Sequence, residues 1–173
     1  YQVTVYGAGF DTPHWARHGV AYQIMVDRFF RGVGTEALLH SKDSLPGITL
    51  HDAWDEVPGY IRGCWQGTGK ADFFGGNLEG IRQKLPYLCD LGITVLYLNP
   101  IFDARSCHKY DTADYTRIDP MFGTRDDLRR LCDDARQMGI RVILDGVFSH
   151  VGDDSIYFNR LGTYGTRTGA FRN

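Results

Sequence analysis

The sequence has no long apolar run, no basic block and no closely paired cysteines, and each absence excludes a class of protein. A membrane-spanning helix needs roughly 20 consecutive apolar residues, and no run in the 173 residues approaches that length. Nucleic acids and anionic membranes attract clusters of lysine and arginine, whereas this chain has a formal net charge of -2. We therefore expect neither a nucleic acid nor a membrane as a partner.

The few cysteines and the residue at the start of the chain are informative about the cellular compartment of the protein. Structural zinc sites use closely spaced cysteine pairs, and none occurs here, so we expect free thiols and a reducing, cytoplasmic compartment. The chain begins with Tyr1 rather than Met, and its first residues do not form a signal peptide. We expect an internal fragment of a longer protein, whose own signal segment, if it has one, lies outside these residues.

Two segments, 88–99 and 135–145, share one pattern. Each begins as the end of a helix, continues through a glycine, and closes with a short apolar run and a polar residue. Gly92 and Gly139 suit the left-handed position that ends a helix. The apolar runs are rich in β-branched residues, which predicts parallel strands buried on both faces. An earlier run, residues 20–26, predicts a further strand.

The sequence also predicts two amphipathic helices. The first has one apolar stripe, an N-cap at Asn77, and Pro86 in its interior, where we expect a kink or a break. In the second, Thr124 and Asp127 form a capping box with Asp in the usual place of Glu. The apolar stripes are formed by Leu78, Ile81, Leu85 and Leu88 in the first helix and by Leu128, Leu131, Ala135 and Met138 in the second.

Alternating strands and helices predict a parallel α/β sheet with right-handed crossovers. A doubly wound open sheet and an eight-stranded barrel both fit this order. No GxGxxG motif follows the first strand, which disfavours the nucleotide-binding version of the open sheet. In both folds the functional residues lie at the C-terminal strand ends, which here carry Asp27, Asn99 and Asp145, each followed by a long connection.

An ordered set of motifs resembles the α-amylase superfamily, glycoside hydrolase family thirteen, and is most similar to its neopullulanase, cyclomaltodextrinase and maltogenic amylase branch. The motifs are residues 22–29, 74–81, 99–102 with 108–115, and 145–150. The resemblance implies a parallel (β/α)8 TIM barrel of which about the first three strand–helix units are present. It also implies a retaining hydrolase of α-1,4-glucosidic bonds in maltooligosaccharides, cyclodextrins, starch or pullulan.

The resemblance divides the chain into three parts. Residues 1–12 are a remnant of a preceding domain or linker, residues 13–150 the first part of the barrel, and residues 151–173 the start of a small domain inserted after strand three. The three catalytic carboxylates of the family lie at the ends of strands four, five and seven. The chain is therefore expected to contain no catalytic residue and to be inactive alone.

Three residues match sugar contacts of the family. Tyr110 matches the aromatic residue that stacks on the sugar beside the scissile bond, and His150 matches a histidine that hydrogen-bonds the same sugar. His108 lines the same rim in a supporting position. Without the resemblance, a tyrosine packed under a loop and an ordinary loop histidine would be the simpler interpretations.

Three aspartates are expected to support the site rather than react. Asp145 stands where a barrel strand ends and invites a catalytic interpretation. The matching family residue instead supports the nucleophile strand through an arginine. Asp111 and Asp114 are expected to anchor the loop that presents Tyr110, because carboxylates commonly accept backbone N–H groups in turns.

No cofactor is expected to be required, and the known calcium positions of the family are poorly matched. Ser149 stands where many relatives use Asn, and Asn77 stands where others use the Asp of a Gly-Gly-Asp sequence, so both are weak calcium ligands. A cluster around Asp43, Asp52 or Asp55 stays open. The loop after strand one forms either an oligosaccharide platform or a small core with its aromatic residues, Trp54, Tyr60, Trp65, Phe73 and Phe74.

Alternative functions remain at this point. The same family includes transglycosylases, and some amylase-like barrels are non-catalytic interaction domains. An unrelated parallel α/β enzyme is a further alternative. The expected partner is an α-glucan oligosaccharide. A homodimer or higher oligomer is also expected, because an open part of a barrel exposes strand edges.

Overall fold

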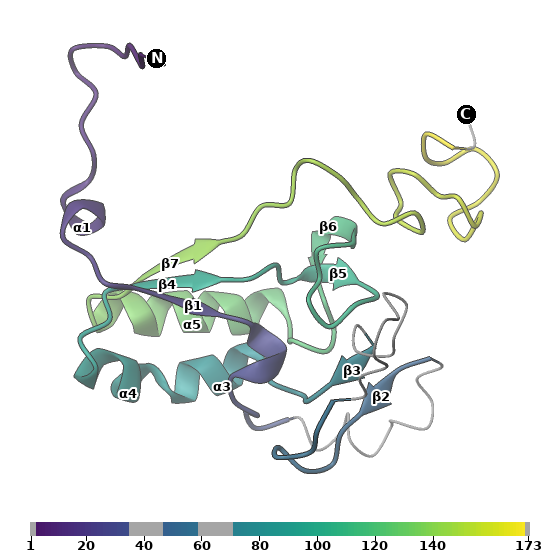
Figure 1. Cartoon of the computed structure of the whole chain (residues 1–173), viewed down its shortest axis with the longest axis horizontal. Helices are drawn as coiled ribbons and strands as arrows, with labels where there is room; N and C mark the ends of the chain where they lie inside the picture. The colour runs from purple at the N-terminus through teal and green to yellow at the C-terminus, as the bar shows by residue number, and fades with distance from the viewer. Residues whose placement is uncertain (1–2, 35–46, 59–70, 172–173) are drawn as a thin grey trace.

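The central sheet has three parallel strands in the order that consecutive barrel strands would have (Figure 1). The computed structural model describes residues 3–34, 47–58 and 71–171. In the sheet, Tyr97 lies in register with Gln23 on one side and Ile143 on the other. The parallel pairing confirms the predicted sheet, whose order β1-β4-β7 joins β1 (Ala21–Ile24), β4 (Val95–Leu98) and β7 (Arg141–Leu144).

The first strand is shorter than the predicted range of 20–26. Its end passes into a short 3-10 helix, η1 (Val26–Arg28), in which Asp27 is fully buried. The N–H of Arg28 donates to the carbonyl of Met25 at 2.9 Å, so the backbone turns back on itself instead of extending the ladder. The apolar side chain of Val26 contributes to the core from this turn, which is why the sequence pattern does not show where the strand ends.

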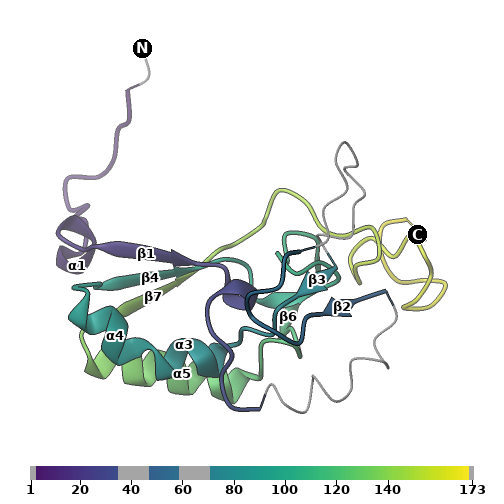
Figure 2. The same cartoon turned by 60° about the horizontal axis from the view of Figure 1, so that its bottom comes forward.

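Three helices cover one face of the sheet, α3 (Leu78–Gln83), α4 (Leu85–Asp90) and α5 (Arg125–Gln137), as Figure 2 shows. The predicted break is confirmed, because Pro86 stands in the first turn of α4 and Lys84 ends α3. Proline lacks the N–H that an uninterrupted helix would need there. The predicted N-cap is also confirmed, since Asn77 Oδ1 accepts the N–H of Gly80 at 2.7 Å.

The capping box of α5 has the predicted reciprocal bonds. The side chain of Thr124 accepts from the N–H of Asp127, and the Asp127 carboxylate accepts from the N–H of Thr124 at 2.7 Å. Such a cap stabilises a helix by about 1 kcal/mol. The predicted glycine ends are present as well, with φ of 82° at Gly92 and 77° at Gly139.

The core lies between the sheet and these helices. The whole apolar stripe of the first helical segment is buried, and in α5 Leu131 and Ala135 are fully buried. Each fully buried leucine of this kind contributes about 1.5–3 kcal/mol. Met138 departs from the prediction, because it lies at the C-cap of α5 and is 41% exposed. Because α5 ends at Gln137, Met138 does not continue the apolar stripe that packs on the sheet.

Both long connections contain strands that the sequence pattern did not predict. The first connection has a parallel pair, β2 (Thr49–Leu50) with β3 (Asp72–Phe73). The second has an antiparallel pair with an irregular register, β5 (Phe102–Ala104) with β6 (Thr112–Ile118). β2, β3 and β5 have only two or three residues, which is too short to show an alternating pattern. β6 has seven residues, but its burial does not alternate along the strand. These strands give the connections a fixed shape.

The aromatic residues of the first connection form a small core where they are described. Phe73 is fully buried and Phe74 is 4% exposed. The Phe74 ring stacks on the His51 ring at 4.3 Å and carries the Arg28 guanidinium at 4.4 Å. Trp54 meets Phe74 edge-on and stays 42% exposed. Tyr60, Trp65 and Asp43 lie outside the described residues.

Asp27 ties this small core to the end of β1. Its carboxylate accepts the N–H groups of Phe74 at 3.0 Å and Gly75 at 3.1 Å, and its own carbonyl accepts the N–H of Gly76 at 3.0 Å. The backbones approach so closely that a Cβ on Gly76 would lie 2.1 Å from the carbonyl oxygen of Val26. A glycine is therefore required at this contact.

We expect Gly76→Ala to lower the free energy of unfolding by about 1–3 kcal/mol, because the added methyl must push two backbone segments apart. Gly7→Ala is the matched control, since a Cβ there meets nothing within 4 Å. Thermal unfolding of a protein that contains the complete barrel measures both. Equal midpoints for the two variants would contradict the close approach.

The ends of the chain leave the sheet in different directions (Figure 1). The described N-terminal residues are exposed and include one helical turn, α1 (His14–Arg17). The C-terminal tail is tied to β6, because Gly152 and Ile156 donate to the carbonyls of Thr112 and Ala113, both at 3.0 Å. Among the described helices, none has the length and apolar character for crossing a bilayer. The division at residues 12 and 150 stays a prediction.

Candidate functional site

The candidate site begins where β4 and β7 end. The hydroxyl of Tyr110 donates a hydrogen bond to Asp145 Oδ2 at 2.8 Å, across 35 positions of sequence. Burial, and then the hydrogen bond to the Asp145 carboxylate, raises the pKa of Tyr110 to about 12. The phenol therefore stays a neutral hydrogen-bond donor at and well above neutral pH. The structure thus joins two of the residues that the sequence singled out.

Sequence reasoning missed Tyr97. It belongs to β4, two positions before Asn99, so its side chain points to the same face of the sheet, away from the helices. Burial is the main cause that raises the pKa of Tyr97, and the Asp145 carboxylate adds to it. Asn99 Oδ1 accepts from Gln23 Nε2 at 2.7 Å on this same face. The sequence signal that could have identified Tyr97 is its spacing of two residues from Asn99, which predicts that both side chains lie on the same face of the strand.

His108 supports the backbone that presents Tyr110. Its Nδ1 accepts the N–H of Tyr110 at 3.1 Å and lies 3.0 Å from the Ser106 hydroxyl. The hydroxyl proton of Ser106 goes to Asp111. A ring nitrogen that accepts an N–H carries no proton itself, so neutral His108 is protonated on Nε2. The His108 and Tyr110 rings lie 5.8 Å apart.

Asp111 anchors this loop as predicted, whereas Asp114 lies in β6 and its hydrogen bonds to Thr116 stay within that strand, so an anchoring role of Asp114 in the loop stays a prediction. Asp111 accepts both the hydroxyl and the N–H of Ser106. Asp114 Oδ1 accepts the N–H and the hydroxyl of Thr116, both at 2.7 Å. Neither carboxylate is directed at a reacting group in these contacts. Within the loop between β5 and β6, Asp111 thus holds the backbone at Ser106.

His150 is placed differently from Tyr110. It is exposed, and its Nδ1 lies 3.0 Å from the hydroxyl of Ser149. Within residues 3–34, 47–58 and 71–171, no hydrogen bond joins His150 to Tyr110 or Asp145. Its contact with a sugar therefore stays a prediction.

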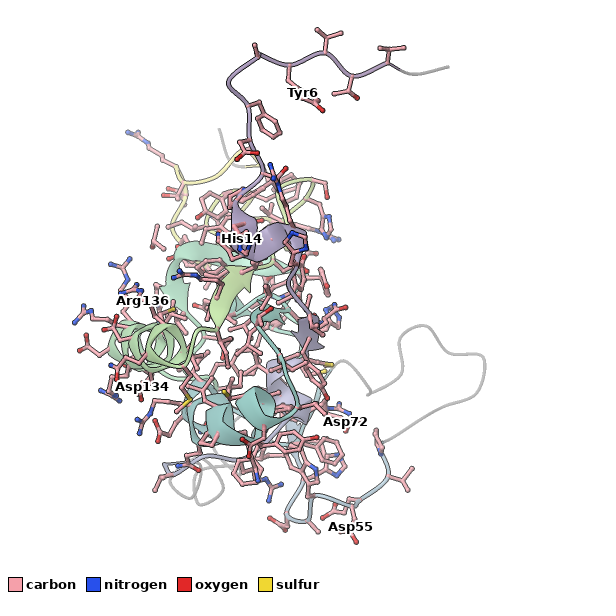
Figure 3. All side chains as sticks on the ribbon, turned by 90° about the vertical axis from the view of Figure 1, so that its left-hand side faces the viewer. Tyr6, His14, Asp55, Asp72, Asp134 and Arg136 are labelled. Carbon is pink, nitrogen blue, oxygen red and sulfur yellow. The ribbon has the colours of Figure 1, made fainter. Side chains whose placement is uncertain are left out.

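The weak calcium candidates are engaged in other bonds. Asn77 Oδ1 accepts two N–H groups, from Gly80 at 2.7 Å and Gly32 at 3.1 Å, which occupies the two lone pairs of a carbonyl oxygen. Asp52 and Asp55 are exposed, and Figure 3 shows Asp55 on the outer loop, separate from Asp72. Among the described side chains, no three of His, Cys, Asp or Glu are grouped to hold a metal ion.

The comparison with protein families decides the identity of this arrangement. Residues 23–168 match the model described as the alpha-amylase catalytic domain. The chain belongs to the α-amylase family. The match includes Tyr110, Asp145 and His150, the residues that carried the resemblance in the sequence.

Similar proteins include an amylopullulanase and a neopullulanase. Over 95% of its length the chain is 49% identical to an amylopullulanase of Thermoanaerobacterium saccharolyticum, and it spans 13% of that protein. It is 43% identical to neopullulanase 2 of Thermoactinomyces vulgaris over 86% of its length, and spans 22% of that protein. The chain thus corresponds to a small part of each relative.

Solved structures of the α-amylase family show the same fold. The type III pullulan hydrolase of Thermococcus kodakarensis matches with a TM-score of 0.70 at 37% identity, over 84% of this chain and 26% of that one. The cyclic α-maltosyl-(1→6)-maltose hydrolase of Arthrobacter globiformis, in complex with that sugar, matches with a TM-score of 0.69 at 30% identity, over 93% of this chain and 32% of that one. The three parallel strands are the first part of a TIM barrel, which settles the choice between the two folds.

Proposed function

We propose that this chain forms the first, sugar-binding part of the catalytic barrel of a retaining α-glucan hydrolase. The observation that carries the proposal is the hydrogen bond from Tyr110 to Asp145 at the C-terminal ends of the strands, where TIM-barrel enzymes bind their substrates. The names of the relatives support an α-glucan as the substrate class. The proposed reaction uses no cofactor.

In this proposal Tyr110 holds the sugar that is cleaved. One face of its ring stacks on the apolar C–H face of a pyranose, while its hydroxyl stays bound to Asp145. Asp145 fixes the ring position and does not attack. His150, from the exposed loop after β7, donates a hydrogen bond to a hydroxyl of the same sugar.

The bond cleavage itself requires two further carboxylates. In a retaining glycosidase one attacks the anomeric carbon, and the other protonates the leaving oxygen and then activates water. The two lie about 5–5.5 Å apart. By the family resemblance, both come from later strands of the barrel. The residues of this chain bind and orient the sugar that lies between these two carboxylates.

The proposal is tested with a protein that carries this chain within a complete barrel. We expect it to hydrolyse α-1,4 bonds of maltotriose, pullulan or cyclodextrin and to release the α-anomer first, which NMR of the fresh product detects. Release of the β-anomer would exclude the retaining mechanism, and absence of hydrolysis on all three would exclude the proposed function. Products longer than maltotriose would instead assign the chain to a transglycosylase.

A further inference from the structure

Lys109 is buried in an unusual way for a lysine. Its side chain is 1% exposed, although lysine is almost never fully buried unless it is paired. Its backbone has a φ of 62°, which residues other than glycine rarely adopt. It stands immediately before Tyr110. The position therefore combines a buried charge and a strained backbone beside the residue that is proposed to hold the sugar.

The Lys109 ammonium has two hydrogen-bond acceptors and two aromatic rings as partners. Nζ donates to Asp119 Oδ2 at 2.6 Å and to the carbonyl of Ala104 at 2.8 Å. The rings of Phe73 and Phe122 lie 4.8 Å and 5.2 Å from Nζ. These partners belong to β3, to β5 and to the segment between β6 and α5. Because a buried charge is costly without such partners, the ammonium is confined to this point.

Asp119 is fixed without help from Lys109. Its Oδ1 accepts the N–H of Met121 at 2.9 Å, and its backbone N–H donates to the carbonyl of Ile101 at 2.9 Å. Its carbonyl accepts the N–H of Phe122 at 2.9 Å. Asp119 therefore serves as a rigid anchor at the base of the β5–β6 hairpin. Lys109 connects the tip of the loop to that anchor.

The backbone of Lys109 is bound on both sides as well. Its N–H donates to Ser106 Oγ at 3.0 Å, and its carbonyl accepts from Thr112 Oγ1 at 3.3 Å. Turning this backbone out of the left-handed region would redirect the next residue. The phenol of Tyr110 would then leave Asp145, since the two are joined by a single hydrogen bond.

We propose that Lys109 is a positioning residue, whose buried ammonium, anchored on Asp119, holds the left-handed turn that places the Tyr110 phenol on Asp145. Its effect on catalysis rests on the proposed function. Its effect on the geometry of Tyr110 does not, so the two can be tested separately. The role requires both the charge of Lys109 and the length of its side chain.

The first test is structural. We expect a crystal structure of Lys109→Met, in a protein with the complete barrel, to show the Tyr110 hydroxyl displaced from Asp145 by more than the length of a hydrogen bond, about 3 Å. An unchanged Tyr110–Asp145 contact would overturn the proposal whatever the enzymatic activity. If Lys109→Met does not fold, Lys109→Met with Asp119→Asn leaves no unpaired buried charge and is expected to show the same displacement.

The second test is a double-mutant cycle on maltotriose. We expect Lys109→Met to lower kcat/KM about tenfold or more in the presence of Tyr110, and less than about twofold in a Tyr110→Ala background. Equal losses in both backgrounds would show a general structural role and overturn the proposal. A Tyr110→Ala variant as active as the parent would instead count against the proposed function.

Lys84→Met is the matched control for both tests. The Lys84 ammonium also lies over an aromatic ring, that of Phe30, at 4.1 Å. It stands between α3 and α4, outside the β5–β6 connection that carries Tyr110. We expect Lys84→Met to leave the Tyr110–Asp145 contact and kcat/KM unchanged. A loss in this control equal to that of Lys109→Met would also overturn the proposal.

Discussion

The 173-residue chain by itself is expected to release no sugar from maltotriose or pullulan. Retaining hydrolysis needs a nucleophile and an acid/base carboxylate about 5–5.5 Å apart on either side of the scissile bond. The aspartate that stands at the strand ends, Asp145, is bound to the hydroxyl of Tyr110. Asp27, in η1 after β1, is fully buried and accepts the backbone N–H of Phe74. Neither is placed to attack a sugar.

A reducing-sugar assay on the purified chain measures this, with the chain extended to a complete barrel as the positive control. Measurable turnover by the chain alone would contradict the prediction. Light scattering on the same sample is expected to show self-association. β1 and β7 are the outer strands of the three-stranded sheet, and outer strands can pair with another chain. The face of the sheet away from the helices, which carries Tyr97, can contact another chain as well. A clean monomer would contradict that second part.

Tyr110→Ala, in a protein with the complete barrel, is expected to lower kcat/KM for maltotriose on the order of a hundredfold, or about 2.7 kcal/mol of transition-state stabilisation. The substitution removes the ring that orients the sugar and also the hydrogen bond from the Tyr110 hydroxyl to Asp145. Steady-state kinetics measure the loss. A change of less than about twofold would show that Tyr110 does not contact the reacting sugar.

Tyr110→Phe separates the two contributions. It keeps the ring for stacking but loses the bond to Asp145, so we expect a loss of about tenfold or less. Because the pKa of Tyr110 is raised to about 12, the phenol is protonated throughout the working range of pH. The dependence of kcat/KM on pH should therefore have the same shape for the parent and for Tyr110→Phe below a pH of about 10. A rise or fall of kcat/KM with pH in the parent that is missing from Tyr110→Phe would contradict a protonated phenol.

Much of the fold could be predicted because its signals are local. A glycine at a helix end, a proline in a first turn and a capping box depend on residues within one turn of helix, and all three are present at Gly92, Pro86 and Thr124. Continuous apolar runs are typical of buried parallel strands, and they located β4 and β7. The predicted burial on both faces was wrong for β7, because it is an outer strand of the described sheet and its Leu144 is 38% exposed. The end of β1 was wrong because Val26 is apolar and buried in a turn as well.

The candidate site was only partly predictable. Family motifs identified Tyr110, His150 and Asp145, but they did not show which of these meet, and only the first and last do in the described contacts. Tyr97 was missed because a tyrosine within an apolar run also fits a buried strand. The ion pair of Lys109 with Asp119 joins residues ten positions apart in a loop without a periodic pattern.

The sequence by itself determined the family, the order of strands and helices, and the residue types available at the strand ends. The tertiary structure alone decided that Tyr110 donates to Asp145, that Phe74 belongs to a small core, and that Lys109 is buried. The physical reason is range. Helix caps and apolar periodicity act between neighbours in the chain, whereas a hydrogen bond across 35 positions exists only after β4 and β7 have paired.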